Sequence, residues 1–214
     1  MNTKFTNACE RIDQPCPPIW MMRQAGRYQQ GYMEMKEQFT FEQTCKLPRI
    51  AARTAMLPID QFDFDIAILF SDILFPIEGL GVPLKFAPGP QFEWTINEDN
   101  YKQHSDVDRA TQHMQFQATA VQATRESLHK SKSLIGFVGG PWTLLNYATG
   151  KQPNMSLKWK AEYLEEVIVP VLQRNIHLQL EAGAEKVMIL DSGVGNMSEA
   201  FFKNQYMRLL KPLI

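Results

Sequence analysis

Residues 65–71 read Asp-Ile-Ala-Ile-Leu-Phe-Ser, an apolar run that polar residues interrupt only at its two ends. Runs of this kind are typical of parallel strands, which are buried on both faces of a sheet. Other apolar segments of strand length occupy residues 18–22, 134–138 and 186–190. We therefore expect four buried strands, of which 65–71 is the second.

Segments with helical periodicity separate these strands. Apolar or small residues recur every three to four positions over 106–129 and over 157–182, and a shorter helical pattern covers 48–57. We expect Pro170 to kink the helix at 157–182 and Gly183 to end it. Strands that alternate with helices indicate βαβ units, which form a parallel α/β sheet with right-handed crossovers. The sequence predicts about four such units.

Two further segments complete the expected organisation. Three glycines and three prolines between positions 79 and 91 predict a short hairpin or excursion, and a last helix is expected at 198–210. We expect a single domain over residues 1–214, in which residues 1–16 form a polar N-terminal extension.

Composition and charge exclude several classes of protein. The chain has 22 Lys and Arg against 23 Asp and Glu, so no net field would attract it to nucleic acid or to an anionic membrane. No apolar segment is long enough to span a bilayer and no secretory signal is present, so we expect a cytoplasmic protein. The 3 cysteines and 4 histidines lack the spacings of zinc sites, and the glycine fingerprint for dinucleotides is incomplete. We therefore expect no metal or nucleotide cofactor.

Four polar residues share one position relative to the expected strands. Each lies at the C-terminal end of a strand or a few residues after it: Arg23, Asp72, Tyr147 and Ser192. Barrels and open α/β sheets build their active sites at that end. Because loops are polar in any protein, the coincidence favours a site there without assigning a role to any single residue.

Two of these four residues, Arg23 and Asp72, are charged, and a second arginine, Arg27, follows the first in the same loop. Arg23 and Arg27 carry guanidinium groups suited to bidentate binding of carboxylates. The alternative is a pair of arginines on a solvated helix face, although Gly26 between them makes an irregular loop at least as plausible. Asp72 is flanked by apolar residues, and burying its carboxylate costs several kcal/mol unless it is paired or hydrogen-bonded. It is either a structural acid or an acceptor for N–H groups of a ligand.

Three motifs of the chain resemble those of the uroporphyrinogen decarboxylase family. The first is Trp-Met-Met-Arg-Gln-Ala-Gly-Arg-Tyr at 20–28, the second is Phe-Ser-Asp-Ile-Leu at 70–74, and the third begins Gly-Phe-Val-Gly-Gly-Pro-Trp-Thr-Leu at 136 and reaches Tyr147. They occur in the family's order, and the resemblance extends from about residue 17 to the last residue. The family fold is a (β/α)8 TIM barrel of about 250 residues or more. The resemblance therefore implies the N-terminal part of such a barrel, about four βα units.

The resemblance also implies a reaction and a set of residues for it. The family removes CO2 from the four acetate side chains of uroporphyrinogen III to give coproporphyrinogen III, in porphyrin and heme biosynthesis. Because the protonated pyrrole accepts the electrons, no cofactor is required. Arg23 and Arg27 would hold substrate carboxylates, and Asp72 would bind the pyrrole N–H groups. The implied substrate-binding residues are Met22, Gln24, Ile68, Phe70, Phe137, Tyr147 and Ser192.

The chain also departs from the family. It ends near the middle of the family's length, so we expect the later strands and a distal histidine motif to be absent, and Gln-Gly-Tyr at 30–32 replaces the usual proline-glutamate-aromatic run. It is either a truncated copy or a chain that associates with itself or another chain to complete its sheet, and a complete barrel implies a homodimer. An inactive fragment that binds porphyrinogen or a partner is one alternative function. A corrinoid-dependent methyltransferase of the same superfamily is another, although its zinc site needs a histidine near a cysteine.

Overall fold

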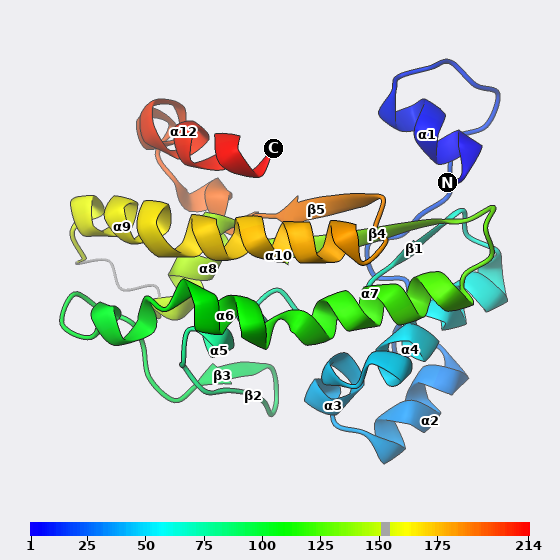
Figure 1. Ribbon diagram of the computed structural model, residues 1–214, viewed down its shortest axis with the longest axis horizontal. Helices are drawn as coiled ribbons and strands as arrows, with labels where there is room; N and C mark the ends of the chain where they lie inside the picture. The colour runs from blue at the N-terminus through cyan, green and yellow to red at the C-terminus, as the bar shows by residue number, and fades with distance from the viewer. Residues whose placement is uncertain (151–154) are drawn as a thin grey trace. The chain divides into compact units, whose positions relative to one another are not determined.

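Groups of helices separate short strands along the chain in the computed structural model, which describes residues 1–150 and 155–214 (Figure 1). These residues form two units, each built from three separate stretches. Unit 1 consists of Met1–Asp72, Phe116–Phe137 and Leu178–Met188, and unit 2 of Ile73–Gln115, Val138–His177 and Ile189–Ile214. Because neither unit is continuous in sequence, the division does not separate two sequential domains. A single domain over 1–214 stays a prediction.

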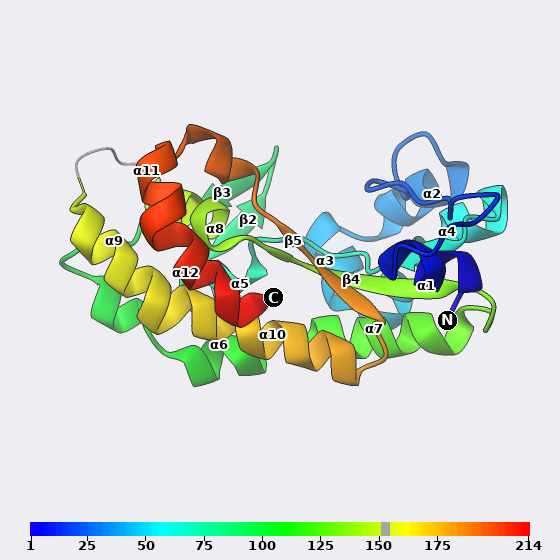
Figure 2. The same cartoon turned by 90° about the horizontal axis from the view of Figure 1, so that it is seen from above.

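A parallel pair of strands stands where the longest apolar runs predicted it. β1 (Ile66–Ile68) runs parallel to β4 (Ser133–Gly139), with Ile66 opposite Ser133. β5 (Lys186–Leu190) lies beside β4 in the sheet order β1-β4-β5 (Figure 2). β4 is buried along its whole length, whereas the apolar residues of β5 are only half-buried. Three of the four predicted strands are thus confirmed, β4 and β5 almost residue for residue.

The predicted strand at 18–22 is wrong, because no strand forms there. The segment lies beside the start of β1, where the backbone N–H of Asp65 donates to the carbonyl of Ile19 (3.0 Å). The N–H of Ile19, however, donates to the carboxylate of Asp65 (2.8 Å) and not to a backbone carbonyl. Pro17 and Pro18 have no N–H to donate. A strand ladder therefore cannot extend along this segment.

The N-terminal residues form a helix that the sequence did not predict. α1 (Thr3–Cys9) begins after Asn2, whose side-chain oxygen accepts from the N–H of Phe5 (3.1 Å). The backbone N–H of Asn2 donates to Ser133 Oγ (2.9 Å), and its side-chain amide donates to Asp65 Oδ1 (3.2 Å). The expected polar extension is thus fixed to the starts of β1 and β4.

The other helices of unit 1 follow the apolar periodicity. α2 (Gln30–Gln38) precedes α3 (Phe41–Lys46), which starts at a capping box formed by Thr40 and Gln43. α4 (Pro48–Phe62) has its proline in the first turn, as predicted, and runs five residues beyond the expected end. The expected helix at 106–129 is two helices, α6 (Val107–His113) in unit 2 and α7 (Gln115–Ser127), which from Phe116 onward belongs to unit 1, because the chain turns at Met114.

Unit 2 contains the predicted hairpin and most of the remaining helices. β2 (Leu84–Phe86) pairs antiparallel with β3 (Pro90–Phe92), and Gly89 between them has a φ of +78°. The helices of unit 2 besides α6 include α5 (Phe75–Gly79), α8 (Pro141–Ala148), α9 (Leu157–Tyr163), α11 (Glu199–Phe201) and α12 (Met207–Leu210).

The long helix at 157–182 is interrupted where proline was expected to disturb it. α9 and α10 (Val169–Glu181) are joined by a π-helical segment, Leu164–Ile168. Pro170 cannot donate to an earlier carbonyl, and its ring crowds the preceding turn, so the regular hydrogen-bond pattern changes there. Gly183 follows the helix with a φ of +110°, which confirms its predicted role at the helix end.

Candidate functional site

The loop after β1 carries Asp72 and is held by a helix that lies far from it in sequence. Gln117 of α7 donates from Nε2 to Ser71 Oγ (2.7 Å) and, over a longer distance, to the backbone carbonyl of Asp72 (3.4 Å). Gln117 is only 2% exposed, whereas Asp72 is half-buried. A buried amide from α7 therefore fixes the main chain at the predicted catalytic carboxylate.

The two predicted arginines lie on an irregular loop, not on a helix face. Arg23 and Arg27 are both exposed, while Gln24 between them is only 2% exposed. The side-chain amide of Gln24 donates to the carbonyl of Ile66 in β1 (3.0 Å), and its backbone carbonyl accepts from the hydroxyl of Tyr28. Gln24 Oε1 is buried without a hydrogen-bond partner in the described chain. This acceptor could receive an N–H from a ligand or a water proton.

Electrostatic effects connect the arginine loop with Asp72 through two residues that the sequence did not single out. Burial raises the pKa of the Cys45 thiol, and the Asp72 carboxylate raises it further. Burial likewise raises the pKa of Tyr32, Cys45 adds to the increase, and the Arg27 guanidinium opposes it. Tyr32 is therefore within electrostatic range of Arg27, and Cys45 within that of Asp72. The only sequence signal for Tyr32 was its place in the run that departs from the family.

The predicted apolar site residues of unit 1 differ in their contacts and their exposure. The ring of Phe70 lies 5.9 Å from that of Tyr32 and 6.0 Å from that of Phe41, measured between ring centroids. Ile68 is half-buried, and Phe137 is only 8% exposed. Met22, in contrast, is exposed. Their predicted contacts with a substrate stay predictions.

Tyr147 and Ser192 belong to unit 2, where their segments come together. Tyr147 lies on α8, one turn after Thr143, and Ser192 follows Asp191 directly. Asp191 Oδ1 accepts from the backbone N–H (2.8 Å) and the hydroxyl (2.7 Å) of Thr143. The N–H of Gly193 donates to the same hydroxyl (2.8 Å). The loop that carries Ser192 is therefore fastened to the helix that carries Tyr147.

Asp191 is the centre of this arrangement, and it directly follows the strand predicted at 186–190. Its second carboxylate oxygen accepts from the hydroxyl of Tyr206, which in turn accepts from the N–H of Trp142 (3.0 Å). Burial raises the pKa of Tyr206, and Asp191 raises it further. A Cβ on Gly140 would lie 2.1 Å from the Cβ of Asp191, so only glycine allows this approach. The signal that could have identified Asp191 was its place at a strand end.

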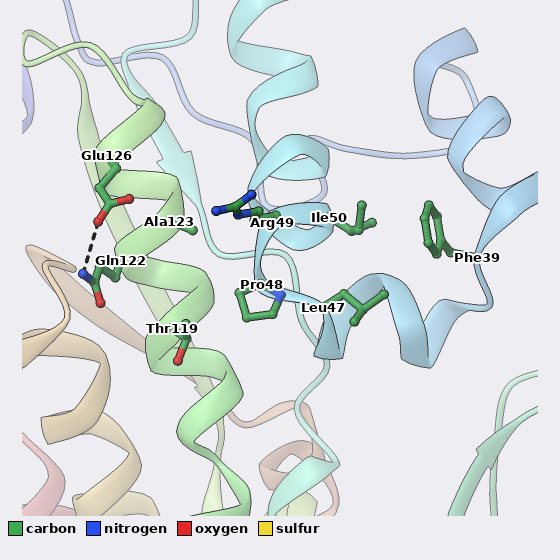
Figure 3. A pocket seen from close by; sticks show the side chains of 9 residues that line it. All are labelled: Phe39, Leu47, Pro48, Arg49, Ile50, Thr119, Gln122, Ala123 and Glu126. Carbon is green, nitrogen blue, oxygen red and sulfur yellow. Dashed lines mark hydrogen bonds between the residues drawn. The ribbon is translucent and has the colours of Figure 1, made fainter.

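A pocket in unit 1 contains none of the predicted site residues. Its volume is about 600 Å³, and it lies between the α3–α4 corner and α7 (Figure 3). Its lining residues are Phe39, Leu47, Pro48, Arg49, Ile50, Thr119, Gln122, Ala123 and Glu126. The candidate site is therefore identified by the loops described above and not by this cavity.

Residues 1–150 and 155–214 lack two kinds of feature. They contain no group of three or more His, Cys, Asp or Glu side chains that could hold a metal ion. No helix in these residues is long and apolar enough to cross a membrane.

Comparison with known proteins places the chain in a family. The uroporphyrinogen decarboxylase (URO-D) family model matches residues 1–214. The uroporphyrinogen decarboxylase of Carboxydothermus hydrogenoformans is 35% identical over 210 residues, which are 92% of this chain and 60% of that protein. The protein of the same name from Geobacter sp. is 34% identical over 225 residues, covering 100% of this chain and 66% of its own length. The chain thus spans 60–66% of the length of these curated relatives.

A solved structure supports the same fold. A methyltransferase from Methanosarcina mazei superposes with a TM-score of 0.77 at 14% sequence identity, covering 98% of this chain and 65% of that one. At this identity the likeness concerns the fold alone. The predicted fold class, an α/β chain that covers part of a (β/α)8 barrel, is confirmed. The chain belongs to the uroporphyrinogen decarboxylase family.

Proposed function

We propose that this chain supplies the N-terminal part of a uroporphyrinogen decarboxylase, a carboxy-lyase of porphyrin and heme biosynthesis. The reaction removes CO2 from the four acetate side chains of uroporphyrinogen III and gives coproporphyrinogen III. The observation that supports the proposal most is in unit 1, where the ring of Tyr32, whose pKa burial raises and the Arg27 guanidinium lowers, lies 5.9 Å from the ring of Phe70, two residues before Asp72. A cation for carboxylates and an anion for pyrrole N–H groups are the two complements that this substrate needs.

The chemistry requires little from the protein beyond binding and electrostatics. Protonation of a pyrrole carbon makes the ring cationic, and the electrons of the breaking bond to CO2 flow into that ring. A proton then adds to the exocyclic carbon, and the ring proton is lost, so each acetate becomes a methyl group with net uptake of one proton. In this scheme Asp72 accepts hydrogen bonds from the pyrrole N–H groups and stabilises the positive charge that develops. Gln117 holds the main chain at Asp72 for this purpose.

The remaining predicted residues have supporting roles in the proposal. Arg23 and Arg27 hold carboxylates of the substrate, and the buried Gln24 attaches their loop to β1. Ile68, Phe70 and Phe137 pack against the tetrapyrrole, together with Met22, while Tyr147 and Ser192 contact its side chains. We further propose that the protein is cytoplasmic, that it forms a homodimer when the barrel is complete, and that it binds neither nucleic acid nor membranes.

The direct test is anaerobic incubation of the purified chain with uroporphyrinogen III, with chromatography of the products by their number of carboxylates. Arg27→Gln should raise KM about 10- to 100-fold, because one charge-assisted hydrogen-bond partner is lost. Arg53→Gln is the matched control, since Arg53 is also an exposed arginine of unit 1. We expect it to leave KM unchanged.

The outcomes separate the two functions that fit the length of the chain. Substrate that keeps all its carboxylates despite measurable binding would favour a porphyrinogen-binding or partner-binding fragment. A chain that neither binds nor converts uroporphyrinogen contradicts the proposal. The structural likeness to a methyltransferase does not add a rival, because at 14% identity it concerns the fold alone.

A further inference from the structure

Two buried glutamines of unit 1, Gln117 and Gln179, contact the predicted site segments without belonging to the family motifs. Gln117 is 2% exposed and Gln179 is 0% exposed. Burying a side-chain amide is unfavourable unless its polar atoms form hydrogen bonds, whereas an apolar side chain of the same size avoids that cost. The partners of the two amides therefore indicate what they contribute.

Gln179 binds both backbone polar atoms of a single residue, Phe137. Its Oε1 accepts from the N–H of Phe137 (2.9 Å), and its Nε2 donates to the carbonyl of Phe137 (3.0 Å). In a sheet these two groups would ordinarily pair with a neighbouring strand. A Cβ on Gly136 would lie 2.0 Å from Gln179 Oε1, so the glycine before Phe137 makes room for the amide. The contact therefore depends both on the amide of Gln179 and on the missing side chain of Gly136.

Gln117 makes a similar contact at the end of β1. Its Nε2 donates to the hydroxyl of Ser71 and to the backbone carbonyl of Asp72. Gln122, on the same helix, is exposed and donates instead to Glu126 (3.1 Å). Gln173, on the same helix as Gln179, donates to the carbonyl of Pro212 (3.1 Å). Each buried glutamine thus has, on its own helix, another glutamine whose amide donates elsewhere, Gln122 to Glu126 and Gln173 to Pro212.

We propose that Gln117 and Gln179 are positioning residues of the decarboxylase site, Gln117 for Asp72 and Gln179 for Phe137. Both act through the main chain, so they set where the carboxylate and the ring stand without touching the substrate. Displacing a catalytic group by about 1 Å can lower a rate about 100-fold. The catalytic consequence rests on the proposed function, whereas the positioning itself is measurable without turnover.

The experiment compares Gln117→Met and Gln179→Met with the controls Gln122→Met and Gln173→Met. Methionine keeps the length of the side chain and removes its amide. In Gln179→Met, we expect hydrogen exchange of the Phe137 amide to accelerate about 10-fold or more, because its acceptor is gone. In Gln117→Met, we expect 15N order parameters at residues 71 and 72 to fall from about 0.85 toward 0.6. Neither control should change these values.

Kinetics with uroporphyrinogen III then separate positioning from general packing. Gln117→Met should lower kcat about 10- to 100-fold with less than about a threefold change in KM, because Asp72 acts on charge that develops during the reaction. Combining it with Ser71→Ala should lower kcat less than the product of the two single effects. Exchange that accelerates uniformly over the chain, or order parameters at 71 and 72 that stay at the level of the unmodified protein, overturns the proposal. If the unmodified chain shows no turnover, the proposed function fails while exchange and order parameters still decide the positioning.

Discussion

β1 has an aspartate near each end, and the two are held in different ways. Asp65, just before the strand, is 7% exposed, and its carboxylate accepts from the N–H of Ile19 and from the ammonium group of Lys4 (3.3 Å). Asp72, after the strand, is half-buried, and Gln117 holds it through its backbone carbonyl. One acid uses its carboxylate to join segments of the fold, whereas the other has its main chain fixed by a neutral amide.

This difference bears on the alternative that the sequence left open for Asp72. A buried structural acid needs a paired or hydrogen-bonded carboxylate, and that of Asp65 is both. The carboxylate of Asp72 raises the pKa of the buried Cys45. A carboxylate that fixes the fold should matter most for stability, and one that serves a site should matter most for turnover.

The largest expected effects come from replacing each of these two acids by asparagine, because one variant should lose turnover and the other should lose stability. Asp72→Asn should lower kcat about 1000-fold, as the removal of a group that stabilises developing charge does in other enzymes. It should change the free energy of unfolding by less than about 1 kcal/mol. Asp65→Asn should instead lower the free energy of unfolding by about 2–3 kcal/mol, because a buried carboxylate and its partners are disrupted. The measurements are anaerobic turnover and urea unfolding, with Asp60→Asn as the exposed control.

Equal losses of turnover in Asp65→Asn and Asp72→Asn, after correction for the folded fraction, would contradict the comparison. A control that behaves like either variant would show that charge in unit 1, and not position, determines the result.

A third aspartate, Asp191, sharpens the comparison. Like Asp72 it follows the C-terminal end of a strand, β5, but like Asp65 it is held by hydrogen bonds to its carboxylate. Gly140→Ala should lower the free energy of unfolding by about 2–3 kcal/mol, since the added Cβ would stand 2.1 Å from the Cβ of Asp191. Gly195→Ala is the control, because no atom lies within 4 Å of a Cβ at Gly195. Calorimetry on both variants measures the difference. Equal melting temperatures would show that the approach of Gly140 to Asp191 relaxes without cost.

A smaller effect is expected from the hydroxyl that pairs with Asp191. Tyr206→Phe removes the donor to the Asp191 carboxylate and the acceptor of the Trp142 N–H, so it should destabilise the protein by about 1–2 kcal/mol. Tyr28→Phe, which removes a hydroxyl from an exposed residue, should cost less than about 1 kcal/mol. Urea unfolding of both variants tests the order, and a larger loss in Tyr28→Phe would reverse it.

The fold could be predicted where local pattern and burial agree. β4 and β5 follow apolar runs, and their bounds match the prediction almost residue for residue. α1 was not predicted because it buries none of its residues, and its start is fixed by contacts of Asn2 with residues more than 60 positions away. The strand at 18–22 was wrong because the side chain of Asp65 takes the N–H that a ladder would need.

The residues of the candidate site also include some that the sequence indicates and others that it does not. Motifs identified Asp72 and the arginine loop, because those residues lie in runs that resemble a family. Gln117 and Gln179 have no local signal, since their partners lie about 45 and 42 positions away in the chain. A buried glutamine in a helical pattern looks like any polar residue on a helix face until the structure shows which face it occupies.

The pH dependence of stability gives the smallest expected effect and isolates the role of Asp65. Burial alone would raise the pKa of Asp65, but hydrogen bonds from the Ile19 N–H and from Lys4 outweigh it and hold the pKa below its ordinary value. The unfolded chain therefore binds this proton first, at a pKa of about 3.9. The stabilisation is complete above that pH and is lost as pH falls through the lower pKa of the folded state. In urea unfolding between about pH 6 and pH 2.5, the stability gap between the unmodified protein and Asp65→Asn should narrow only below about pH 4. A gap that stays constant across this range would mean that the Asp65 carboxylate is not what holds the start of β1.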